Sequence, residues 1–204
     1  MSIIIFLKVF FVCLLGAMSP GPSMVVVINN AIFKNRYHGI LTSLGHGIGI
    51  GVYAFFAVVG IALIIKTNLL VFNGIKIISI VFLIYLGIKS IIKKNELDFS
   101  KKRLKGGIAS FFQGLSISLL NPKIFIWFLA IYSQFMSTDN NFIFNTVLIL
   151  TAGIVDAIWY ISLTFLVTSK VVFELIRNKS VLLQKIIGIT FLLIGSILFV
   201  QVLI

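Results

Sequence analysis

The sequence predicts an all-α integral membrane protein, whose six transmembrane helices form two repeats of three helices with inverted topology. Three observations carry this prediction. Hydrophobic residues make up 60% of the 204 residues, and the mean hydropathy is +1.18, which is far more apolar than a soluble domain. The apolar residues form runs long enough to cross a bilayer. A proline-containing interruption in the first run recurs about half the chain length later.

The apolar runs define one transmembrane domain with short connectors. A helix needs about 20 apolar residues to cross a hydrocarbon core of about 30 Å. On that rule the spans are residues 3–30, 39–65, 71–92, 107–136, 142–169 and 181–203. We therefore expect a single domain over 1–204, with a first repeat at about 1–92, a basic loop at about 93–106 and a second repeat at about 107–204.

Lysine and arginine residues collect on one side of the predicted membrane. The connectors after the first, third and fifth spans contain Lys34, Arg36, Lys89, Lys93, Lys94, Lys101, Lys102, Arg103, Lys105, Lys170, Arg177, Lys179 and Lys185. The opposite side has only Lys8 and Lys66. The positive-inside rule therefore places the basic connectors in the cytoplasm and both termini outside. The connector 137–141, with one aspartate as its only charge, fits the outer face.

A net charge of +12 could also indicate a nucleic-acid-binding protein, because basic proteins often bind nucleic acid. No aromatic-and-basic recognition motif accompanies the charge, and the charges lie between apolar blocks. We expect no nucleic-acid partner. The single cysteine, Cys13, excludes an internal disulfide or cysteine cluster and is interpreted as apolar filler.

The first span is interrupted near its middle by Ser19-Pro20-Gly21-Pro22. Proline lacks the N–H that a helix needs and clashes with the preceding turn, so a continuous helix is not expected here. Irregular backbone at membrane depth is tolerated where it is buried in protein or lines a polar cavity. The half-helix after Pro22 directs the N–H groups of Ser23, Met24 and Val25 into the midplane, where they suit a carboxylate. The tetrapeptide therefore predicts a binding site.

The second span carries glycines four residues apart, with a histidine among them. These residues are Gly39, Gly45, Gly47, Gly49 and Gly51, together with His46. Such spacing lets another helix backbone approach closely, so we interpret the glycines as packing residues. His46 is interpreted as a histidine bonded to a neighbouring helix, with a proton relay as the alternative.

The second interruption, Asn121-Pro122-Lys123, lies in the fourth span, about 100 residues after the first. Three spans per half reverse the direction in which the second half enters the membrane, as in transporters with inverted repeats and a midplane substrate site. Two unrelated proline kinks remain the alternative, because membrane helices tolerate proline.

Apart from Lys8, Lys89 and Lys185, which are assigned above to the two sides of the membrane, three charged residues fall inside spans: Lys76, Lys123 and Asp156. Because a charge at the bilayer centre costs about 2.5 to 3.5 kcal/mol on insertion scales, it usually marks a pathway or a pair. Lys76 lies near a span end and can snorkel to the interface. Lys123 and Asp156 lie at similar depth and could pair, either as a structural ion pair or as a site. Asp156 is a candidate proton carrier and a candidate partner for a substrate ammonium.

Neutral hydrogen-bonding groups lie close to the interruptions in sequence. Asn29, Asn30 and Asn121 could bond a substrate or a neighbouring backbone. The predicted site therefore offers acceptors and donors together, which suits a zwitterion. Its residues are Ser19, Pro20, Gly21, Pro22, Asn30, Asn121, Pro122, Lys123 and Asp156.

An ordered set of motifs resembles the LysE/RhtB family of amino-acid exporters over nearly the whole chain. The motifs are Ser19-Pro20-Gly21-Pro22, Lys34-Asn35-Arg36 leading to Gly39, Gly45 and Gly49, Lys76 to Tyr85-Leu86-Gly87, Asn121-Pro122-Lys123, Gln134-Phe135, and Asp156 with Trp159-Tyr160. Asn35, Ser79 and Ser133 depart from residues common in the family, and weaken assignment to a subgroup.

The resemblance implies a bacterial inner-membrane secondary transporter that exports amino acids or related compounds by antiport driven by the proton gradient. It also implies that both proline motifs and Asp156 line the route. No cofactor is expected, and the partners are a small-molecule substrate, protons, the lipid bilayer and, because glycine-rich faces permit it, a second copy in a homodimer.

Three other functions stay open on the residues. A metal or cation exporter would use lone acidic residues, although one aspartate, one histidine and one cysteine in the spans are few for a metal cage. An intramembrane enzyme would need a nucleophile and a base, such as Ser19 or Cys13 with His46, but no recognised catalytic spacing supports it. A purely structural membrane subunit would tolerate loss of both Asp156 and Lys123.

Overall fold

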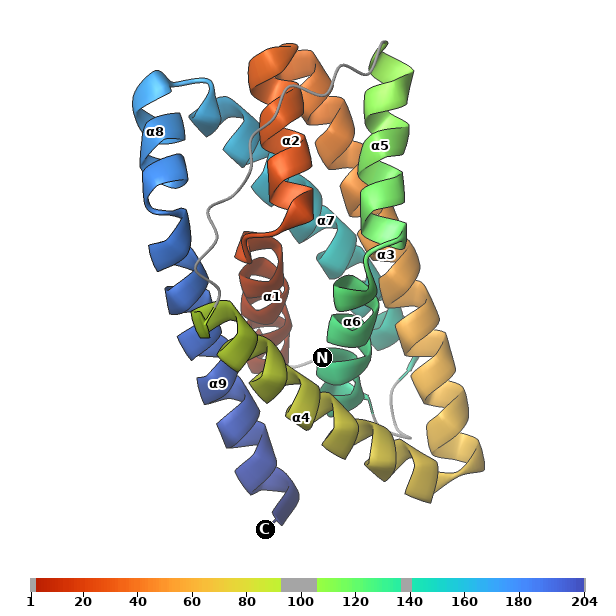
Figure 1. Ribbon diagram of the computed structural model, residues 1–204. Coiled ribbons are helices and arrows are strands. Elements are labelled where there is room, and N and C mark those ends of the chain that lie inside the picture. Colours follow the sequence, from red (N-terminus) through yellow and green to blue (C-terminus); the bar gives the residue numbers. More distant parts are fainter. Residues whose placement is uncertain (1–2, 93–105, 137–140, 204) are drawn as a thin grey trace.

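The computed structural model describes residues 3–92, 106–136 and 141–203, and these ranges are helical without strands (Figure 1). The prediction of an all-α protein is confirmed for these residues. The helices are α1 (Ile3–Met18), α2 (Pro22–Phe33), α3 (Arg36–Thr67), α4 (Leu69–Ile92), α5 (Gly107–Leu119), α6 (Pro122–Phe135), α7 (Phe142–Val167), α8 (Lys170–Asn178) and α9 (Ser180–Leu203).

Two helix pairs meet end to end at the proline motifs. The axes of α1 and α2 differ by 67°, and those of α5 and α6 by 60°. Pro22 and Pro122 each stand at the start of the following helix, where the missing N–H costs nothing. Within the described residues, four single helices are long and apolar enough to cross a membrane, and the number rises to six if each bent pair is one span.

The helix α8 lies where the sequence analysis expected a connector. It is amphipathic, with basic residues at both ends and the exposed apolar side chains of Val171 and Leu175 on its surface. A short amphipathic helix of this kind lies along a membrane interface. The rule that a span needs about 20 apolar residues does not predict α8, because its nine residues are too short to cross a bilayer. Most of the predicted basic loop, residues 93–105, lies outside the described residues.

Helix α3 is the central element, packed against both α5 and α7 (Figure 1). A Cβ atom at Gly45 would overlap the carbonyl oxygen of Phe111 in α5, and a Cβ at Gly114 would overlap the carbonyl of Thr42 in α3. A Cβ at Gly47 would lie 2.8 Å from the carbonyl oxygen of Gly153 in α7. The predicted packing role of these α3 glycines is therefore confirmed, except at Gly51, where an added Cβ would meet nothing within 4 Å.

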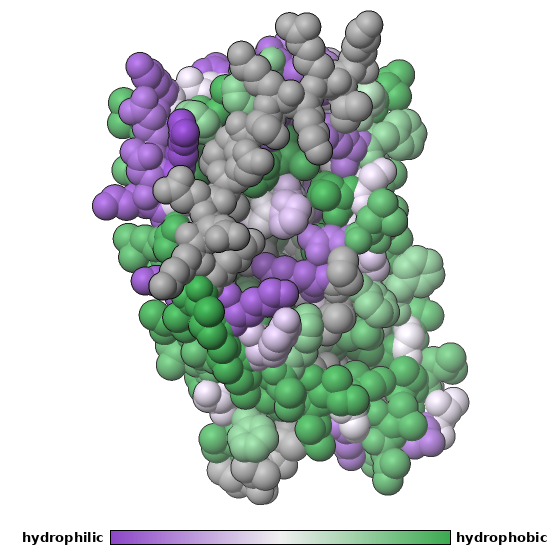
Figure 2. Space-filling model, in the orientation of Figure 1, coloured by the Kyte–Doolittle hydropathy of each residue, from purple (hydrophilic) through white to green (hydrophobic). Residues whose placement is uncertain are grey.

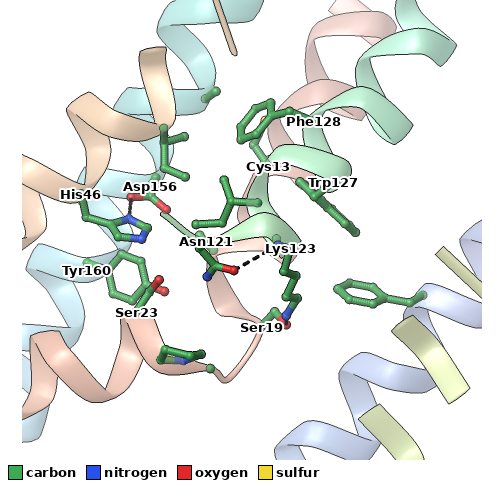
Figure 3. A pocket seen from close by; sticks show the side chains of 18 residues that line it. Cys13, Ser19, Ser23, His46, Asn121, Lys123, Trp127, Phe128, Asp156 and Tyr160 are labelled. Carbon is green, nitrogen blue, oxygen red and sulfur yellow. Dashed lines mark hydrogen bonds and ion pairs between the residues drawn. The ribbon is translucent and has the colours of Figure 1, made fainter. Parts of the chain in front are cut away.

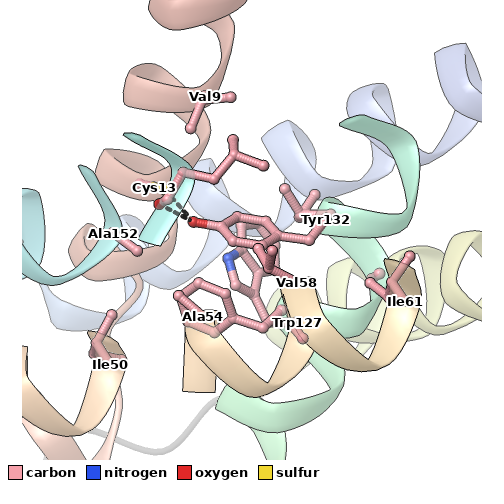
Figure 4. Close-up of a cluster of buried hydrophobic side chains, with 14 of the residues drawn as sticks. Val9, Cys13, Ile50, Ala54, Val58, Ile61, Trp127, Tyr132 and Ala152 are labelled. Carbon is pink, nitrogen blue, oxygen red and sulfur yellow. Dashed lines mark hydrogen bonds between the residues drawn. The ribbon is translucent and has the colours of Figure 1, made fainter. Parts of the chain in front are cut away.

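The main buried cluster joins α1, α3, α6 and α7 (Figure 4). Tyr132 lies in its middle and is 1% exposed, and its hydroxyl donates to the Leu148 carbonyl at 2.7 Å. The Cys13 thiol is buried 3.9 Å from the same hydroxyl. Its place among apolar side chains agrees with the interpretation of Cys13 as filler.

The outer surface is largely apolar. Large hydrophobic side chains such as Leu70 and Ile108 are 83% and 76% exposed, which suits contact with lipid tails. Figure 2 shows hydrophobic side chains over much of the lower half of one face, hydrophilic ones over the upper left near α8, and a hollow in the middle with hydrophilic side chains around it.

Candidate functional site

A cavity of about 60 Å³ lies where the two helix interruptions meet α3, α7 and α9 (Figure 3). Side chains and backbone from both halves of the chain form its walls. The lining residues are Cys13, Gly16, Ala17, Ser19, Gly21, Pro22, Ser23, His46, Ile50, Asn121, Lys123, Ile124, Trp127, Phe128, Ala152, Asp156, Tyr160 and Phe191.

One wall of the cavity carries an acidic group held by a histidine. The Nδ1 atom of His46 in α3 lies 2.6 Å from the Oδ2 atom of Asp156 in α7. The two residues are only 2% and 4% exposed, so this short bond is shielded from water. A hydrogen bond from an imidazole nitrogen compensates part of the cost of placing a carboxylate in an apolar interior.

Tyr160 and Ser23 complete this wall. The rings of Tyr160 and His46 meet edge to face, with centroids 4.9 Å apart, and Ser23 lies beside the Tyr160 hydroxyl in Figure 3. This packing fixes the plane of the imidazole. The other ring nitrogen of His46, Nε2, is buried and has no hydrogen-bond partner in the described part of the chain.

The facing wall carries a basic group from α6. The Nζ atom of Lys123 donates to the Ser19 hydroxyl at 2.6 Å and lies 5.8 Å from the centre of the Phe191 ring. Ser19 belongs to the α1–α2 interruption, so this bond connects the two interrupted regions. In Figure 3 the Lys123 side chain lies across the cavity from the His46–Asp156 pair.

Apolar groups fill the space between the two charged walls. The rings of Trp127 and Phe191 stack with centroids 4.8 Å apart, and Phe128 and Ile50 line the same space. A Cβ at Gly16 would lie 2.8 Å from the Trp127 indole nitrogen, so the indole requires a glycine here. The cavity therefore combines two separated charged ends with an apolar surface.

The helix starts at the interruptions differ from the sequence expectation. The Val25 N–H donates to the Gly21 carbonyl, so this predicted carboxylate donor is already used. At the start of α6, the Asn121 side chain accepts from the Lys123 N–H at 3.1 Å, and the Asn121 carbonyl accepts from Ile124. Because Asn121 already accepts hydrogen bonds from N–H groups at the start of α6, the Lys123 ammonium is the principal group there that attracts an anion.

The structure brings together most of the residues selected from the sequence. The cavity lining includes Ser19, Gly21, Pro22, Asn121, Lys123 and Asp156. Pro20 lies in the interruption but does not line the cavity, and Pro122 starts α6, its side chain lying outside the described atoms. The geometry changes two expected roles: the N–H of Val25 is already bonded, and Asn30 does not line the cavity.

Asn30 lies away from the cavity, in a buried polar cluster between α2, α3 and α5. Its amide nitrogen donates to Thr42 Oγ1 at 2.7 Å and to Gln113 Oε1 at 2.9 Å. Further along the same helices, Ser110 bonds Lys34 Nζ at 3.0 Å and His38 Nδ1 at 2.9 Å. Asn30 thus bonds side chains of the neighbouring helices, whereas the alternative considered for the asparagines was a bond to a neighbouring backbone.

The intramembrane charges also have other partners than expected. The sequence allowed a pair between Lys123 and Asp156, but the carboxylate is paired with His46 and the ammonium is bonded to Ser19. Lys76 lies away from the cavity, with its Nζ atom 4.7 Å from the centre of the Phe72 ring. The two cavity charges are therefore held on separate walls.

Sequence reasoning missed His46 and Tyr160 as site residues. His46 was judged a histidine bonded to a neighbouring helix, which is correct, but the partner is the one intramembrane aspartate of the spans. The available signal was the presence of a histidine in a glycine-rich helix that can approach others closely. The partner is 110 positions away in sequence, and spacing cannot reveal it.

No group of three or more His, Cys, Asp or Glu side chains that could hold a metal ion occurs among the described residues. His46, Asp156 and Cys13 line the cavity but do not form such a group. Metal sites in proteins usually use three or four protein ligands.

These long apolar helices define a multi-pass α-helical membrane protein. The family model for the LysE type translocator matches residues 14–202. The chain therefore belongs to the LysE type translocator family, as the motif resemblance indicated.

Two kinds of relative illustrate the similarity. The uncharacterized membrane protein YrhP of Bacillus subtilis is 27% identical over 161 residues, covering 72% of this chain and 76% of that protein. The leucine efflux protein of Salmonella typhimurium is 29% identical over 126 residues, covering 57% of this chain and 56% of that protein. The chain thus aligns with about half the length of the leucine efflux protein. No solved structure gives a significant match.

Proposed function

We propose that this chain is a secondary active transporter that exports amino acids or their derivatives from the cytoplasm of a bacterium, by alternating access around the cavity. Family membership and the relatives named leucine efflux protein support export of this substrate class. The observation that carries the proposal is the placement of the His46–Asp156 pair and the Lys123–Ser19 bond on facing walls of one cavity.

A zwitterion with an apolar side chain fits this distribution of charge. The Lys123 ammonium attracts the substrate carboxylate, and the Asp156 carboxylate attracts its ammonium group. The substrate side chain packs against Trp127 and Phe128, where apolar contact with the lining stabilises it. The other predicted lining residues, Ser19 and Asn121, provide neutral hydrogen bonds.

The cavity volume indicates a closed conformation. A volume of about 60 Å³ admits a few water molecules but no amino acid. Substrate entry therefore requires the walls to move apart. The bends between α1 and α2 and between α5 and α6 lie at the cavity, and helix halves that pivot there would open it to one side or the other.

An inverted repeat supplies the symmetry that such a mechanism uses, and reciprocal glycine contacts support it. Gly47 and Gly153 each approach the other's carbonyl oxygen where α3 crosses α7, and Gly87 and Gly188 do the same where α4 crosses α9. The paired glycines are separated by 106 and 101 residues, close to the separation of the two proline motifs. A two-fold axis relating 1–92 to 107–204 would produce such self-pairing of corresponding helices.

We further propose six spans in a bacterial inner membrane, with each bent pair forming one span and both termini outside. The basic residues of the connectors support this orientation. Protons are the proposed coupling ion, with Asp156 as the residue that binds substrate and proton in turn, which makes the transporter an antiporter. Intramembrane acidic residues in secondary transporters commonly serve this role.

The test compares efflux from cells preloaded with amino acids or dipeptides. The wild type is expected to export at least one amino acid in a manner that depends on the proton gradient. The Asp156→Asn variant removes the charge but keeps the shape, and gradient-dependent efflux is expected to fall about tenfold or more, the effect of losing one charged hydrogen bond.

Glu174→Gln is the matched control, because Glu174 is an exposed acidic residue of α8. Its efflux is expected to equal that of the wild type. Equal, gradient-dependent export by Asp156→Asn would remove Asp156 from coupling, and absence of amino-acid export by the wild type would overturn the proposed substrate class.

A further inference from the structure

His46 has a buried ring nitrogen that no role described above uses. Its Nδ1 atom bonds Asp156, its ring face is covered by Tyr160, and the residue is 2% exposed. Its Nε2 atom has no hydrogen-bond partner among the described residues. An unpaired polar atom in such a place costs free energy unless a water molecule, a ligand or a proton satisfies it.

We propose that His46 Nε2 is the atom at which a proton and the substrate ammonium group compete, so that His46 and Asp156 act together as the coupling unit. This inference rests on the proposed function and deepens it. It assigns a proton-carrying role to a residue of α3, whereas the sequence made Asp156 in α7 the candidate proton carrier and left a proton relay at His46 as the alternative.

The chemistry follows from the hydrogen-bonding capacity of the pair. When Asp156 is ionised, its carboxylate only accepts hydrogen bonds, and the proton of the 2.6 Å contact then belongs to His46 Nδ1. In the neutral imidazole, Nε2 then has a free lone pair. A substrate ammonium can donate one hydrogen to this lone pair and another to the carboxylate.

When a proton binds Nε2 instead, the ring becomes an imidazolium with two N–H donors. An imidazolium cannot accept a hydrogen bond from an ammonium group, and the two positive charges repel each other. One proton therefore leaves Nε2 when one ammonium group binds, and the reverse exchange returns the proton to the ring. By linkage, each ligand weakens the binding of the other by the same factor.

The titratable groups around the imidazole come from three helices. Asp156 and Tyr160 face it from α7, Lys123 lies across the cavity on α6, and Cys13 lies on α1. The parts of α2 and α5 nearest to it contribute Ser23 and the backbone of Gly114, which do not titrate. Of these groups, histidine is the one whose usual charge change falls between about pH 5 and 8.

The experiment uses full-length protein and the amino acid that the wild type exchanges best, starting with L-leucine. At a pH low enough for the imidazole to be protonated before binding, purified wild type in weakly buffered detergent is expected to release about one proton per amino acid bound. In proteoliposomes, its apparent affinity is expected to fall by about tenfold per pH unit on the acidic side, the limit for one-for-one competition.

His46→Asn retains an amide donor for Asp156 and cannot titrate. Because it lacks the Nε2 acceptor, it is expected to bind amino acids more weakly, with an affinity that no longer depends on pH, and to lose efflux driven by a pH gradient. His38→Asn is the matched control, since His38 is the other histidine of the chain and lies at the far end of α2 and α3. It is expected to behave like the wild type.

Each outcome decides the inference. A His46→Asn protein that keeps the wild-type pH dependence, or a wild type that releases no proton on binding, would overturn it while leaving the exporter standing. If His46→Asn does not reach the membrane, the proton-release measurement on the wild type still decides. A wild type that exchanges no amino acid would overturn the proposed function and this inference with it.

Discussion

At the scale of single residues, the site depends on two short polar contacts that connect distant parts of the chain. His46 and Asp156 are 110 positions apart, and Ser19 and Lys123 are 104 apart. Each contact joins one half of the sequence to the other. A change at either charged residue therefore affects substrate binding and also the attachment of the two halves.

Lys123→Gln tests the basic wall. Replacing the ammonium by a neutral amide removes a charged hydrogen bond worth about 1.5 to 3 kcal/mol, so the apparent affinity for a zwitterionic amino acid is expected to fall about 10- to 100-fold. The measurement is concentration-dependent exchange in proteoliposomes. Lys89→Gln removes an exposed lysine of α4 that lies over the Tyr85 ring and is expected to have no effect. An unchanged affinity in Lys123→Gln would remove Lys123 from substrate binding.

At the scale of helices, glycine determines how closely α3 approaches its partners. Gly45 of α3 and Gly114 of α5 face the backbone of the opposite helix with no room for a Cβ. This contact also holds His46, because a Cβ at Gly114 would lie 3.0 Å from the His46 backbone nitrogen. The packing of α3 on α5 therefore fixes the position of one cavity wall.

Gly45→Ala tests this packing. The added methyl group must push α3 and α5 apart, so the variant is expected to lose about 1 to 3 kcal/mol of stability, observed as a lower unfolding temperature in detergent. Gly60→Ala is the control in the same helix, where nothing lies within 4 Å. Because alanine loses less backbone entropy on folding than glycine, Gly60→Ala is expected to be as stable as the wild type or more stable by up to about 1 kcal/mol. Equal stability of the two variants would show that α3 and α5 do not need this close contact.

At the scale of the whole molecule, the two ends of the helical bundle differ from each other in their number of basic residues. The turn between α3 and α4, at Asn68, and the start of α7, at Asn141, lie on the side with few basic residues. The turn between α8 and α9, at Lys179, lies on the basic side. The proposed orientation therefore predicts that the chain at Asn68 and Asn141 faces the cell exterior and that the turn at Lys179 faces the cytoplasm.

Cysteine labelling in intact cells checks this orientation. In a Cys13→Ala background, Asn68→Cys and Asn141→Cys are expected to react with a membrane-impermeant thiol reagent. Lys179→Cys should react only after the membrane is permeabilised, which makes it the internal control. Labelling of Lys179→Cys in intact cells, with protection at Asn68→Cys, would reverse the proposed orientation.

The sequence by itself determined the properties that depend on composition and local chemistry. Apolar runs predicted the helices, because a membrane requires every backbone polar group to be bonded within its own helix. Proline predicted where helices stop at Ser19-Pro20-Gly21-Pro22 and Asn121-Pro122-Lys123. Most of the candidate cavity residues were selected for the same reason, since they stand at or beside these stops.

Tertiary structure alone decided which side chains meet. It paired Asp156 with His46, bonded Lys123 to Ser19, and moved Asn30 into a different cluster. The physical reason is that the depth of a residue in a membrane follows from its position in the span, whereas its partner depends on helix rotation and on the approach of neighbouring helices. Those are set by many weak contacts between distant segments, which a local pattern in the sequence does not encode.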